Sequence, residues 1–287
     1  MRRFEYHDPA SLAEACALLA HHGAEASVLA GGTDLLVEIK EHLRWPRHVI
    51  DVKRIPGLAA LEYDDRAGLR FGALVTAREI ETSPVVLEKY PGLAQAAREL
   101  GSIQVRYRAT VAGNICRASP SADTLPPLIA DGAAVRIHGP AGGRTIALEE
   151  FFTGPGKTVL APGELVTEVA VPPPAPGTGK HYIKHGRRKA MELATVGVAV
   201  ALTVDGGTCR DIRIALGAVA PTPIRARAAE EALRGRPLAP AAIAAAARNA
   251  MGECRPISNV RGSAEYRREM VGVLVARAIE RAREAVR

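Results

Sequence analysis

Two glycine-containing segments have the residues and the spacing that a phosphate-binding loop needs. In the first, "VLAGGTDLLVEIK" (residues 28–40), two glycines separate an apolar strand-like run from a run with helical spacing. Glycine lets the backbone turn with positive φ and lets a ligand approach the peptide N–H groups with no Cβ in the way. The N–H groups of Gly31, Gly32, Thr33 and Asp34 would then face an anion at the beginning of a helix.

The second segment is "ATVAGNICRASPSADTLPPLIA" (residues 109–130), and it changes how the first is interpreted. Taken alone, the first glycine pair is better explained as an ordinary tight turn, because such turns are common and the GxGxxG spacing is absent. In the second segment Gly113 and Asn114 follow Thr110 and again interrupt an apolar run. Two such loops can hold the two phosphates of a dinucleotide. Asp123 offers an acceptor for a ribose hydroxyl, or else caps the helix that follows it.

Alternating strand and helix patterns must position the first segment. Residues 26–30 have the apolar run of a buried strand, and residues 47–52 have the same pattern. Between them, residues 34–43 have helical spacing, with an apolar stripe made of Leu35, Leu36, Ile39 and Leu43. We therefore expect a β-α-β arrangement in which the glycine pair joins the first strand to the helix.

Two capping boxes predict where further helices begin. Ser11 with Glu14 precedes one helically spaced apolar run, and Thr76 with Glu79 precedes another. A Ser or Thr side chain at such a position accepts a hydrogen bond from the backbone three residues later, and the Glu returns one. Residues 92–100 are also predicted to be helical.

A proline- and glycine-rich stretch, residues 172–180, predicts a domain boundary. Beyond it, strand-like runs come first and helical runs follow, which is typical of an α+β layer. The expected strands cover residues 181–185, 195–204 and 212–220, and the expected helices cover residues 223–233, 240–251 and 263–286. In the last helix Tyr266, Met270, Val273, Leu274 and Ile279 form an apolar stripe, and Arg267 is expected on the solvated side.

Composition limits the classes of function. A chain of 287 residues with 47% hydrophobic content can bury a large core, and its length favours two domains or one large one. The net charge of +7 comes with only 4% aromatic residues, which favours a solvated basic surface or an acidic protein partner over nucleic acid. No apolar run reaches the roughly 20 residues of a membrane-spanning helix, and the N-terminus turns polar where a signal peptide would be apolar. We expect a cytoplasmic protein.

Several other residues invite a chemical role that their surroundings do not support. Cys16, Cys116, Cys209 and Cys254 contain no CxxC pair, so no iron–sulfur or zinc site can be built locally, and Cys116 is expected to be a buried packing residue. His181 and His185 have the ligand spacing of a helix but lie in an alternating run, which favours structural or surface histidines. "TGPGKT" (residues 153–158) imitates a P-loop without its first glycine or a preceding buried strand.

Six ordered blocks together resemble one known family. "AGGTDLL", "GSIQVR", "ATVAGNICRASPSADT", "FFTGPGKTVLAPGELVTEV", "IALGAVAPTPIRA" and "RGSAEYRREM" are similar to the FAD-binding medium subunit of the molybdenum hydroxylases, the xanthine dehydrogenase and carbon monoxide dehydrogenase family. The similarity runs nearly end to end and is far more specific than either glycine segment.

The resemblance implies a fold and a cofactor. The fold would be an α/β FAD-binding unit of the PCMH or vanillyl-alcohol-oxidase-like type, residues 1–175, with two subdomains at about 1–55 and 56–175. A C-terminal α+β domain with an antiparallel sheet and helices, residues 178–287, would follow. Matching motif positions would contact FAD through Leu29, Ala30, Gly31, Gly32, Thr33, Asp34, Leu35, Leu36, Thr110, Ala112, Gly113, Asn114, Asp123, Val166 and Lys184.

Lys184 and Ala112 differ from the other positions in what the sequence says about them. Lys184 would place a cation near the N1/C2 edge of the flavin, where it would stabilise the reduced ring; without the resemblance, an exposed strand lysine is nearly as good an explanation. Ala112 departs from the family pattern T-[VI]-G-G-N, so its methyl group either points away from the ligand or shifts the backbone of the second loop.

The resemblance also implies a function in a complex. The chain would be the FAD-carrying electron-transfer subunit of an oxidoreductase, with no catalytic acid or base and no metal of its own. A large molybdopterin-binding subunit would oxidise the substrate and a small subunit with [2Fe-2S] clusters would relay electrons, in a dimer of heterotrimers. FAD would pass electrons to NAD, a quinone or oxygen. The alternatives are a stand-alone flavin reductase or regulatory nucleotide-binding protein and, more weakly, an ATP-binding module.

Overall fold

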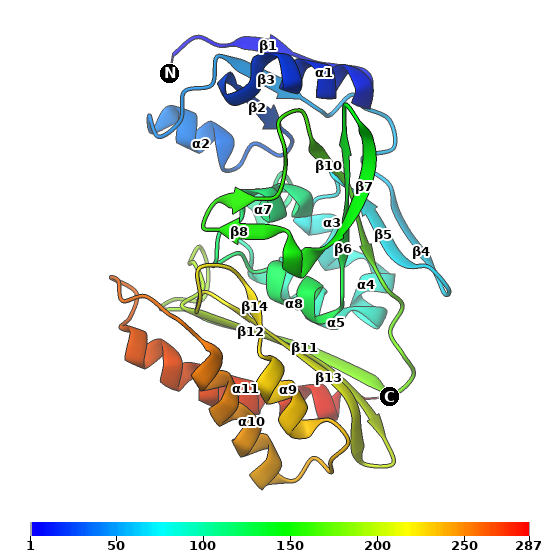
Figure 1. Cartoon of the computed structure of the whole chain (residues 1–287), viewed down its shortest axis with the longest axis vertical. Coiled ribbons are helices and arrows are strands. Elements are labelled where there is room, and N and C mark those ends of the chain that lie inside the picture. The colour runs from blue at the N-terminus through cyan, green and yellow to red at the C-terminus, as the bar shows by residue number, and fades with distance from the viewer. Residues whose placement is uncertain (1, 287) are drawn as a thin grey trace.

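The computed structural model describes residues 2–286, and these residues form three larger sheets stacked along the long axis of the molecule (Figure 1). The N-terminal sheet lies at one end, a five-stranded sheet lies in the middle and the C-terminal sheet lies at the other end. Within the described residues, no helix is long and apolar enough to cross a membrane.

The N-terminal sheet is parallel, and it contains the predicted β-α-β unit. Its strand order is β1-β3-β2, and the helices α1 and α2 supply the crossover connections that parallel strands require. The elements are β1 (Glu5–His7), α1 (Leu12–His22), the short 3-10 helix η1 (Gly23–Glu25), β2 (Ala26–Leu29), α2 (Leu35–Lys40) and β3 (His48–Asp51).

The helix α1 begins where the sequence predicts, with one difference in its cap. Ser11 accepts a hydrogen bond from the backbone N–H of Glu14 at 3.2 Å. The Glu14 carboxylate, however, accepts from the backbone N–H of Ala10 at 2.9 Å instead of from Ser11. At the helix α3 (Ala77–Thr82), both halves of the predicted capping box between Thr76 and Glu79 are present.

The helix α2 is shorter than the predicted helix over residues 34–43. It ends at Lys40, and His42 takes a left-handed conformation with φ of 58°. The N–H of Leu43 then donates to the carbonyl of Glu38 at 2.8 Å, which is the C-terminal closure that a left-handed residue permits. Leu43 is 75% exposed and does not belong to the buried stripe, which consists of Leu35 and Ile39.

The middle sheet is antiparallel, with strand order β4-β5-β10-β6-β7. In the described chain, six helices, α3 to α8, lie between β5 and β6; α7 packs on β10, and α5 and α8 pack on strands of the C-terminal sheet. The elements are β4 (Leu61–Asp64), β5 (Gly68–Gly72), α3 (Ala77–Thr82), α4 (Pro84–Lys89), α5 (Pro91–Glu99), α6 (Ile103–Arg106), α7 (Val111–Arg117), α8 (Leu125–Ala130), β6 (Ala134–Gly139), β7 (Gly142–Ala147), the 3-10 helix η2 (Leu148–Glu150) and β10 (Leu165–Val171).

The P-loop-like residues 153–158 lie in a small hairpin. It is formed by β8 (Phe152–Gly154) and β9 (Lys157–Thr158), which pair in antiparallel orientation. A P-loop joins a strand to a helix whose N-terminus faces the phosphates. The hairpin does not have that architecture, so these residues give no support to an ATP-binding site.

The C-terminal sheet is antiparallel in the order β11-β12-β13-β14, and its two faces join two different cores. Val198, Val200 and Leu202 of β12 pack with the C-terminal helices, whereas Ala199 packs with the core of the middle region. Burial on both faces explains why β12 is almost continuously apolar. The elements are β11 (Thr178–His185), β12 (Val196–Asp205), β13 (Thr208–Gly217), β14 (Ile224–Arg225), α9 (Arg227–Leu233), α10 (Pro240–Glu253) and α11 (Ala264–Glu284).

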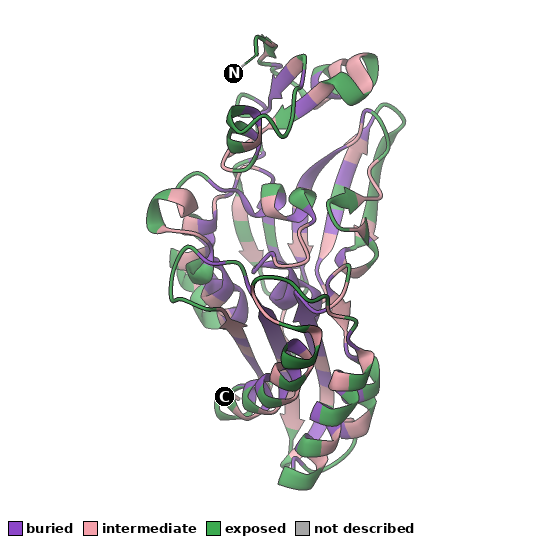
Figure 2. Cartoon of the chain, turned by 90° about the vertical axis from the view of Figure 1, so that its left-hand side faces the viewer, coloured by how far each residue is buried: buried purple, intermediate pink, exposed green. Residues whose placement is uncertain are grey.

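Figure 2 shows this two-sided burial: the strands of the sheet are largely buried, and the outer faces of the C-terminal helices are exposed. Arg267 on α11 corrects a prediction, because it is only 3% exposed instead of solvated. Its guanidinium donates to the carbonyl oxygens of Thr195 and Ala218 and to Oδ1 of Asn259.

The two spaced histidines of β11 have local partners. A nitrogen of His181 is 3.3 Å from the side-chain amide nitrogen of Gln95, and a nitrogen of His185 is 2.8 Å from the hydroxyl of Tyr266. Because β11 is a strand, residues four apart are about two pleats apart and do not converge on one metal ion. The structural interpretation of His181 and His185 is therefore the better one.

Candidate cofactor site

A cleft of about 670 Å³ lies where the N-terminal sheet, the middle region and the C-terminal domain meet. Its size is within the usual range for a small-molecule site. Three segments that are far apart in sequence line it: residues 30–35, residues 109–123 and residues 191–193. Both glycine-containing segments therefore face the same space.

Gly31 and Gly32 shape the first loop in different ways. A Cβ on Gly31 would lie 1.9 Å from the carbonyl oxygen of Arg108, so a glycine is needed where the two loops touch. Gly32 has φ of 74°, and a Cβ there would lie 3.0 Å from Leu29 and 3.1 Å from Leu36. The first glycine thus permits contact between the loops, and the second permits the turn itself.

The first loop presents a row of backbone donors. Within residues 2–286, the N–H groups of Gly31, Gly32, Thr33 and Asp34 donate to no backbone carbonyl. The residues are at least partly exposed, and all four line the cleft. Backbone N–H groups normally find partners in a folded protein. Successive groups that point into a cleft instead are suited to the oxygens of a phosphate.

The second loop is fixed by hydrogen bonds of its own. Thr110 caps α7 by accepting from the N–H of Gly113 at 3.0 Å, and a Cβ on Gly113 would lie 2.7 Å from that hydroxyl. Asn114 accepts from the hydroxyl of Thr124 at 2.7 Å, which orients its amide. Ala112 is 3% exposed and belongs to the main core, so protein packing accommodates its methyl group.

Arg117 links the two loops by ion pairs at the cleft, which it lines together with both of its partners. Its guanidinium lies 2.9 Å from Glu38 on α2 and 3.8 Å from Asp34 in the first loop. The Arg117 side chain is 44% exposed, so each contact contributes modestly. Their combined effect is to hold α7 against α2 at the separation that the cleft requires.

Asp123 lies in the wall of the cleft and is bound from behind by β11. It is 6% exposed, and its carboxylate accepts from the Tyr182 hydroxyl at 2.9 Å and from the Lys184 ammonium at 2.8 Å. Burial raises the pKa of Asp123 to about 6, although Lys184 and Tyr182 act in the opposite direction. Thr124, not Asp123, is the residue at the cap of α8, so Asp123 has no helix-capping role.

Lys184 is buried behind the Asp123 carboxylate. Its side chain is only 7% exposed, and its ammonium also donates to the carbonyl oxygen of Glu99 at 3.0 Å. It is therefore not an exposed strand lysine. Nor is it among the residues that line the cleft. Lys184 can orient Asp123, which does line the cleft.

The structure brings most of the predicted positions to the cleft. The residues that line it are Ala30, Gly31, Gly32, Thr33, Asp34, Leu35, Thr110, Ala112, Gly113, Asn114, Asp123 and Val166. Leu29 and Leu36 do not line it; their side chains flank Gly32. The contact of all fifteen positions with a cofactor remains a prediction.

Two parts of the cleft were missed or misjudged from the sequence. Residues 191–193, between β11 and β12, bring Met191 and Leu193 to the cleft, 53% and 47% exposed. The only sign of this in the sequence is that Met191 and Leu193 are large apolar residues in a connection that also carries several charges. Cys116 is exposed and lines the cleft, so the prediction of a buried packing residue was wrong. It lies on the outer face of α7, whose inner face carries Ile115.

Comparison with known proteins identifies the family. The model of the FAD-binding domain in molybdopterin dehydrogenase matches residues 2–174, which include both loops of the cleft. The chain belongs to this family. The model of the C-terminal domain of the CO dehydrogenase flavoprotein matches residues 181–282. The resemblance to flavoproteins of the molybdenum hydroxylases, which are oxidoreductase components, is thereby confirmed.

Individual relatives agree along the whole length. The carbon monoxide dehydrogenase medium chain of Hydrogenophaga pseudoflava is 39% identical over 280 residues, covering 98% of this chain and 97% of the relative. A putative xanthine dehydrogenase FAD-binding subunit of Escherichia coli K12 is 33% identical, covering 96% and 95%. A solved carbon monoxide dehydrogenase from H. pseudoflava, which lacks the Mo-pyranopterin moiety, matches with a TM-score of 0.96 and 40% identity, covering 100% and 99%.

The residues of the cleft fit FAD. The first loop supplies a row of backbone donors for phosphate oxygens, and Asp123 supplies an acceptor in the wall. Val166, Leu35 and Leu193 supply apolar surface for an aromatic ring system. The described residues of the cleft include no histidine, and the carboxylates of Asp34, Glu38 and Asp123 each lie within 4 Å of a cationic side chain.

Proposed function

We propose that this chain is the FAD-carrying medium subunit of a molybdenum hydroxylase complex and that the cleft is its FAD site. The first loop, residues 31–34, would bind the pyrophosphate through its backbone N–H groups. Thr110, Gly113 and Asn114 would approach it from the opposite side. The observation that carries the proposal is that two backbone loops, one from the N-terminal sheet and one from the middle region, face one cleft and contact each other at Gly31 and Arg108.

Asp123 would accept a hydrogen bond from a polar group of the cofactor. Its carboxylate is already fixed by Tyr182 and Lys184, so it would meet the ligand without losing side-chain freedom. Residues 191–193 would cover part of the cofactor and limit its contact with water. The chain would thus position FAD and set its electrostatic environment, and we assign it no catalytic acid or base.

FAD held by these residues would supply redox chemistry: it would accept electrons from the [2Fe-2S] clusters of a small partner subunit and pass them to an external acceptor such as NAD or a quinone. A large molybdopterin-binding subunit would oxidise the organic substrate. The assembly would be a dimer of heterotrimers in the cytoplasm. This assignment of roles is supported by the relatives that are medium chains of carbon monoxide dehydrogenases, which this chain matches over almost their entire length.

Co-expression of this chain with the large molybdopterin-binding subunit and the small [2Fe-2S] subunit tests this function. We expect the three chains to purify together and the flavin absorbance to bleach when the substrate of the complex is added. The flavoprotein expressed alone should contain FAD that the same substrate does not bleach. A lone chain that reduces a quinone with NADH, and that never associates with the other two, would instead indicate a stand-alone flavin reductase.

A further inference from the structure

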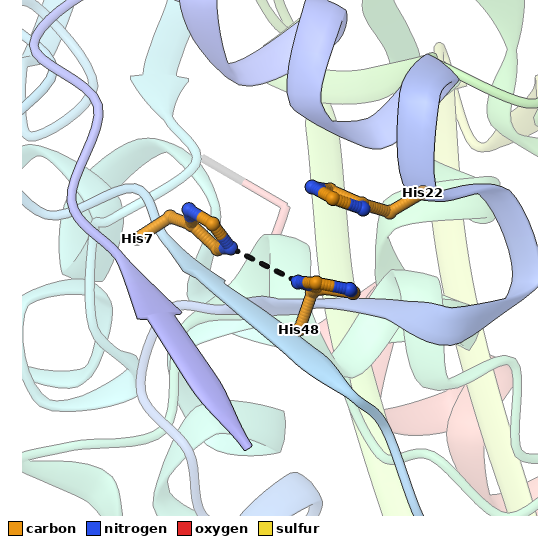
Figure 3. Close-up of side chains that lie close together, drawn as sticks. All are labelled: His7, His22 and His48. Carbon is orange, nitrogen blue, oxygen red and sulfur yellow. Dashed lines mark hydrogen bonds between the residues drawn. The ribbon is translucent and has the colours of Figure 1, made fainter.

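Three histidines gather at one edge of the N-terminal sheet. His7 is the last residue of β1, His22 is the last residue of α1 and His48 is the first residue of β3. They come from segments that are far apart in sequence, and their side chains point toward one another (Figure 3). One nitrogen of each ring lies within 4.8 Å of the corresponding nitrogens of the other two.

The spacing of two of these nitrogens is close to that in a metal site. Nε2 of His7 and Nδ1 of His48 are 3.1 Å apart. A tetrahedral zinc ion with Zn–N bonds of about 2.0–2.1 Å separates its ligand nitrogens by roughly 3.3–3.4 Å. A shift of a few tenths of an ångström would therefore allow both nitrogens to bind one ion.

The third ring lies against the second, and because a metal ion sits close to the plane of each imidazole ligand, His22 would have to rotate its ring to bind the same ion. The rings of His22 and His48 are stacked, with centroids 3.5 Å apart and planes 17° from parallel. Figure 3 shows that a nitrogen of His22 lies on the same side as Nδ1 of His48, toward His7. A hydrogen bond between His7 and His48 accounts for two of the rings, but it does not explain why the third also turns a nitrogen to this point.

The surroundings favour metal-binding imidazoles. All three histidines are partly buried, and the side chain of His48 is only 12% exposed. Glu5 places a carboxylate oxygen 3.4 Å from Nδ1 of His48 and adds negative charge at the open side.

We propose that His7, His22 and His48 form a binding site for a divalent transition-metal ion of the zinc type. Imidazole ligands suit zinc, and three of them leave a fourth position for water or for Glu5. None of the three histidines lines the FAD cleft. The ion would join β1, β3 and the end of α1, and so would cross-link the N-terminal sheet independently of FAD.

Metal titration of the full FAD-loaded chain tests the proposal. Any polyhistidine tag is removed first, and the protein is stripped with a chelator and titrated with Zn²⁺ against a competing indicator. We expect one zinc ion per chain. His48→Gln and His22→Gln should each weaken binding by at least about tenfold. The triple variant of all three histidines should lose the site, while His42→Gln, which changes an exposed histidine, should bind as the wild type does.

Two further measurements separate loss of the site from loss of the fold. Circular dichroism and FAD content should be the same in the triple variant as in the wild type, and Zn²⁺ should raise the melting temperature of the wild type only. Co²⁺ in place of Zn²⁺ should give the visible absorption bands of a tetrahedral site. The proposal is wrong if the wild type shows no saturable binding of Zn²⁺, or if the folded triple variant binds it equally well.

Discussion

At the scale of single residues, the two positions of the first loop require glycine for different physical reasons. The Cβ position of Gly31 is occupied by the Arg108 carbonyl, so protein packing alone requires a glycine there. At Gly32 the requirement is the positive φ of 74°. A substitution at Gly32 would act through the backbone of the loop and through Leu29 and Leu36, and would not simply fill the path of the phosphate.

Gly32→Ala should weaken FAD binding by about tenfold, because a side chain at positive φ strains the loop that presents the donors. Gly57→Ala is the matched control, since Gly57 has a similar φ of 82° and open space around it. Titration of the apoproteins with FAD, followed by flavin fluorescence, gives both affinities. Equal affinities in the two variants would show that the geometry of this loop does not matter for binding.

Asp123 should make the stability of the apoprotein depend on pH. Burial raises its pKa from 3.8 to about 6, so the folded state holds this proton more tightly than the unfolded chain does. The stabilising contribution is complete below the unfolded pKa, and it is lost as the pH rises through the folded pKa. We therefore expect the free energy of unfolding to fall between about pH 4 and pH 6.

Urea unfolding over this pH range measures that dependence in the wild type and in Asp123→Asn. The amide does not titrate, so the variant should lack the part of the slope that comes from Asp123. If the free energy of unfolding depends on pH in the same way in the two proteins, the pKa of Asp123 is not raised.

At the scale of elements, one strand fixes both ends of one helix. Lys184 of β11 pairs with Asp123 just before α8, and Lys180 of β11 pairs with Asp131 just after it, at 2.7 Å. Lys180 and Asp131 are 6% and 3% exposed at their side chains, and the ammonium also lies 4.1 Å from the centre of the Tyr90 ring. The C-terminal sheet thereby sets the position of the cleft wall.

Lys180→Met should lower the free energy of unfolding by about 3–5 kcal/mol, because Asp131 would be left buried without a partner. Lys189→Met removes the same charge from an exposed position, so its effect should be within about 0.5 kcal/mol of zero. Denaturant unfolding of the two variants compares them directly. Similar midpoints would mean that water or another group satisfies Asp131.

Features that depend on residues close together in the chain could be predicted from the sequence, whereas features that depend on residues far apart could not. The capping box of Thr76 and Glu79 depends on residues three apart, and it forms as predicted. Helix α2 ends early because His42 becomes left-handed, which no repeat in the sequence indicates. The partners of Asp123, 59 and 61 residues away on β11, become visible only in the fold.

The candidate site shows the same division. The two loops could be recognised from their glycines and from the resemblance to the family, and twelve of the fifteen predicted positions line the cleft. Residues 191–193 have no periodic pattern, and they reach the cleft only because β11 packs against α5 and α8. The sequence predicts a solvated helix residue at Arg267, because its burial depends on the carbonyl groups of Thr195 and Ala218, which are 72 and 49 residues away in the chain.

At the scale of the whole molecule, the cleft depends on all three layers of the fold. The first loop comes from the N-terminal sheet, α7 comes from the middle region and residues 191–193 come from the C-terminal domain. The two-sided burial of β12 makes the C-terminal domain part of the same packed body. FAD binding should therefore stabilise the whole chain and not one subdomain alone.

The most direct test is the amount of FAD that the full chain binds. We predict that the purified apoprotein takes up one FAD per chain and that Gly31→Ala, which forces a Cβ to 1.9 Å from the Arg108 carbonyl, binds it much more weakly. Gly207→Ala, at a glycine with open space around it, should bind FAD as the wild type does. A folded wild-type chain that takes up no FAD, or a Gly31→Ala variant with unchanged affinity, would contradict the assignment of the cleft.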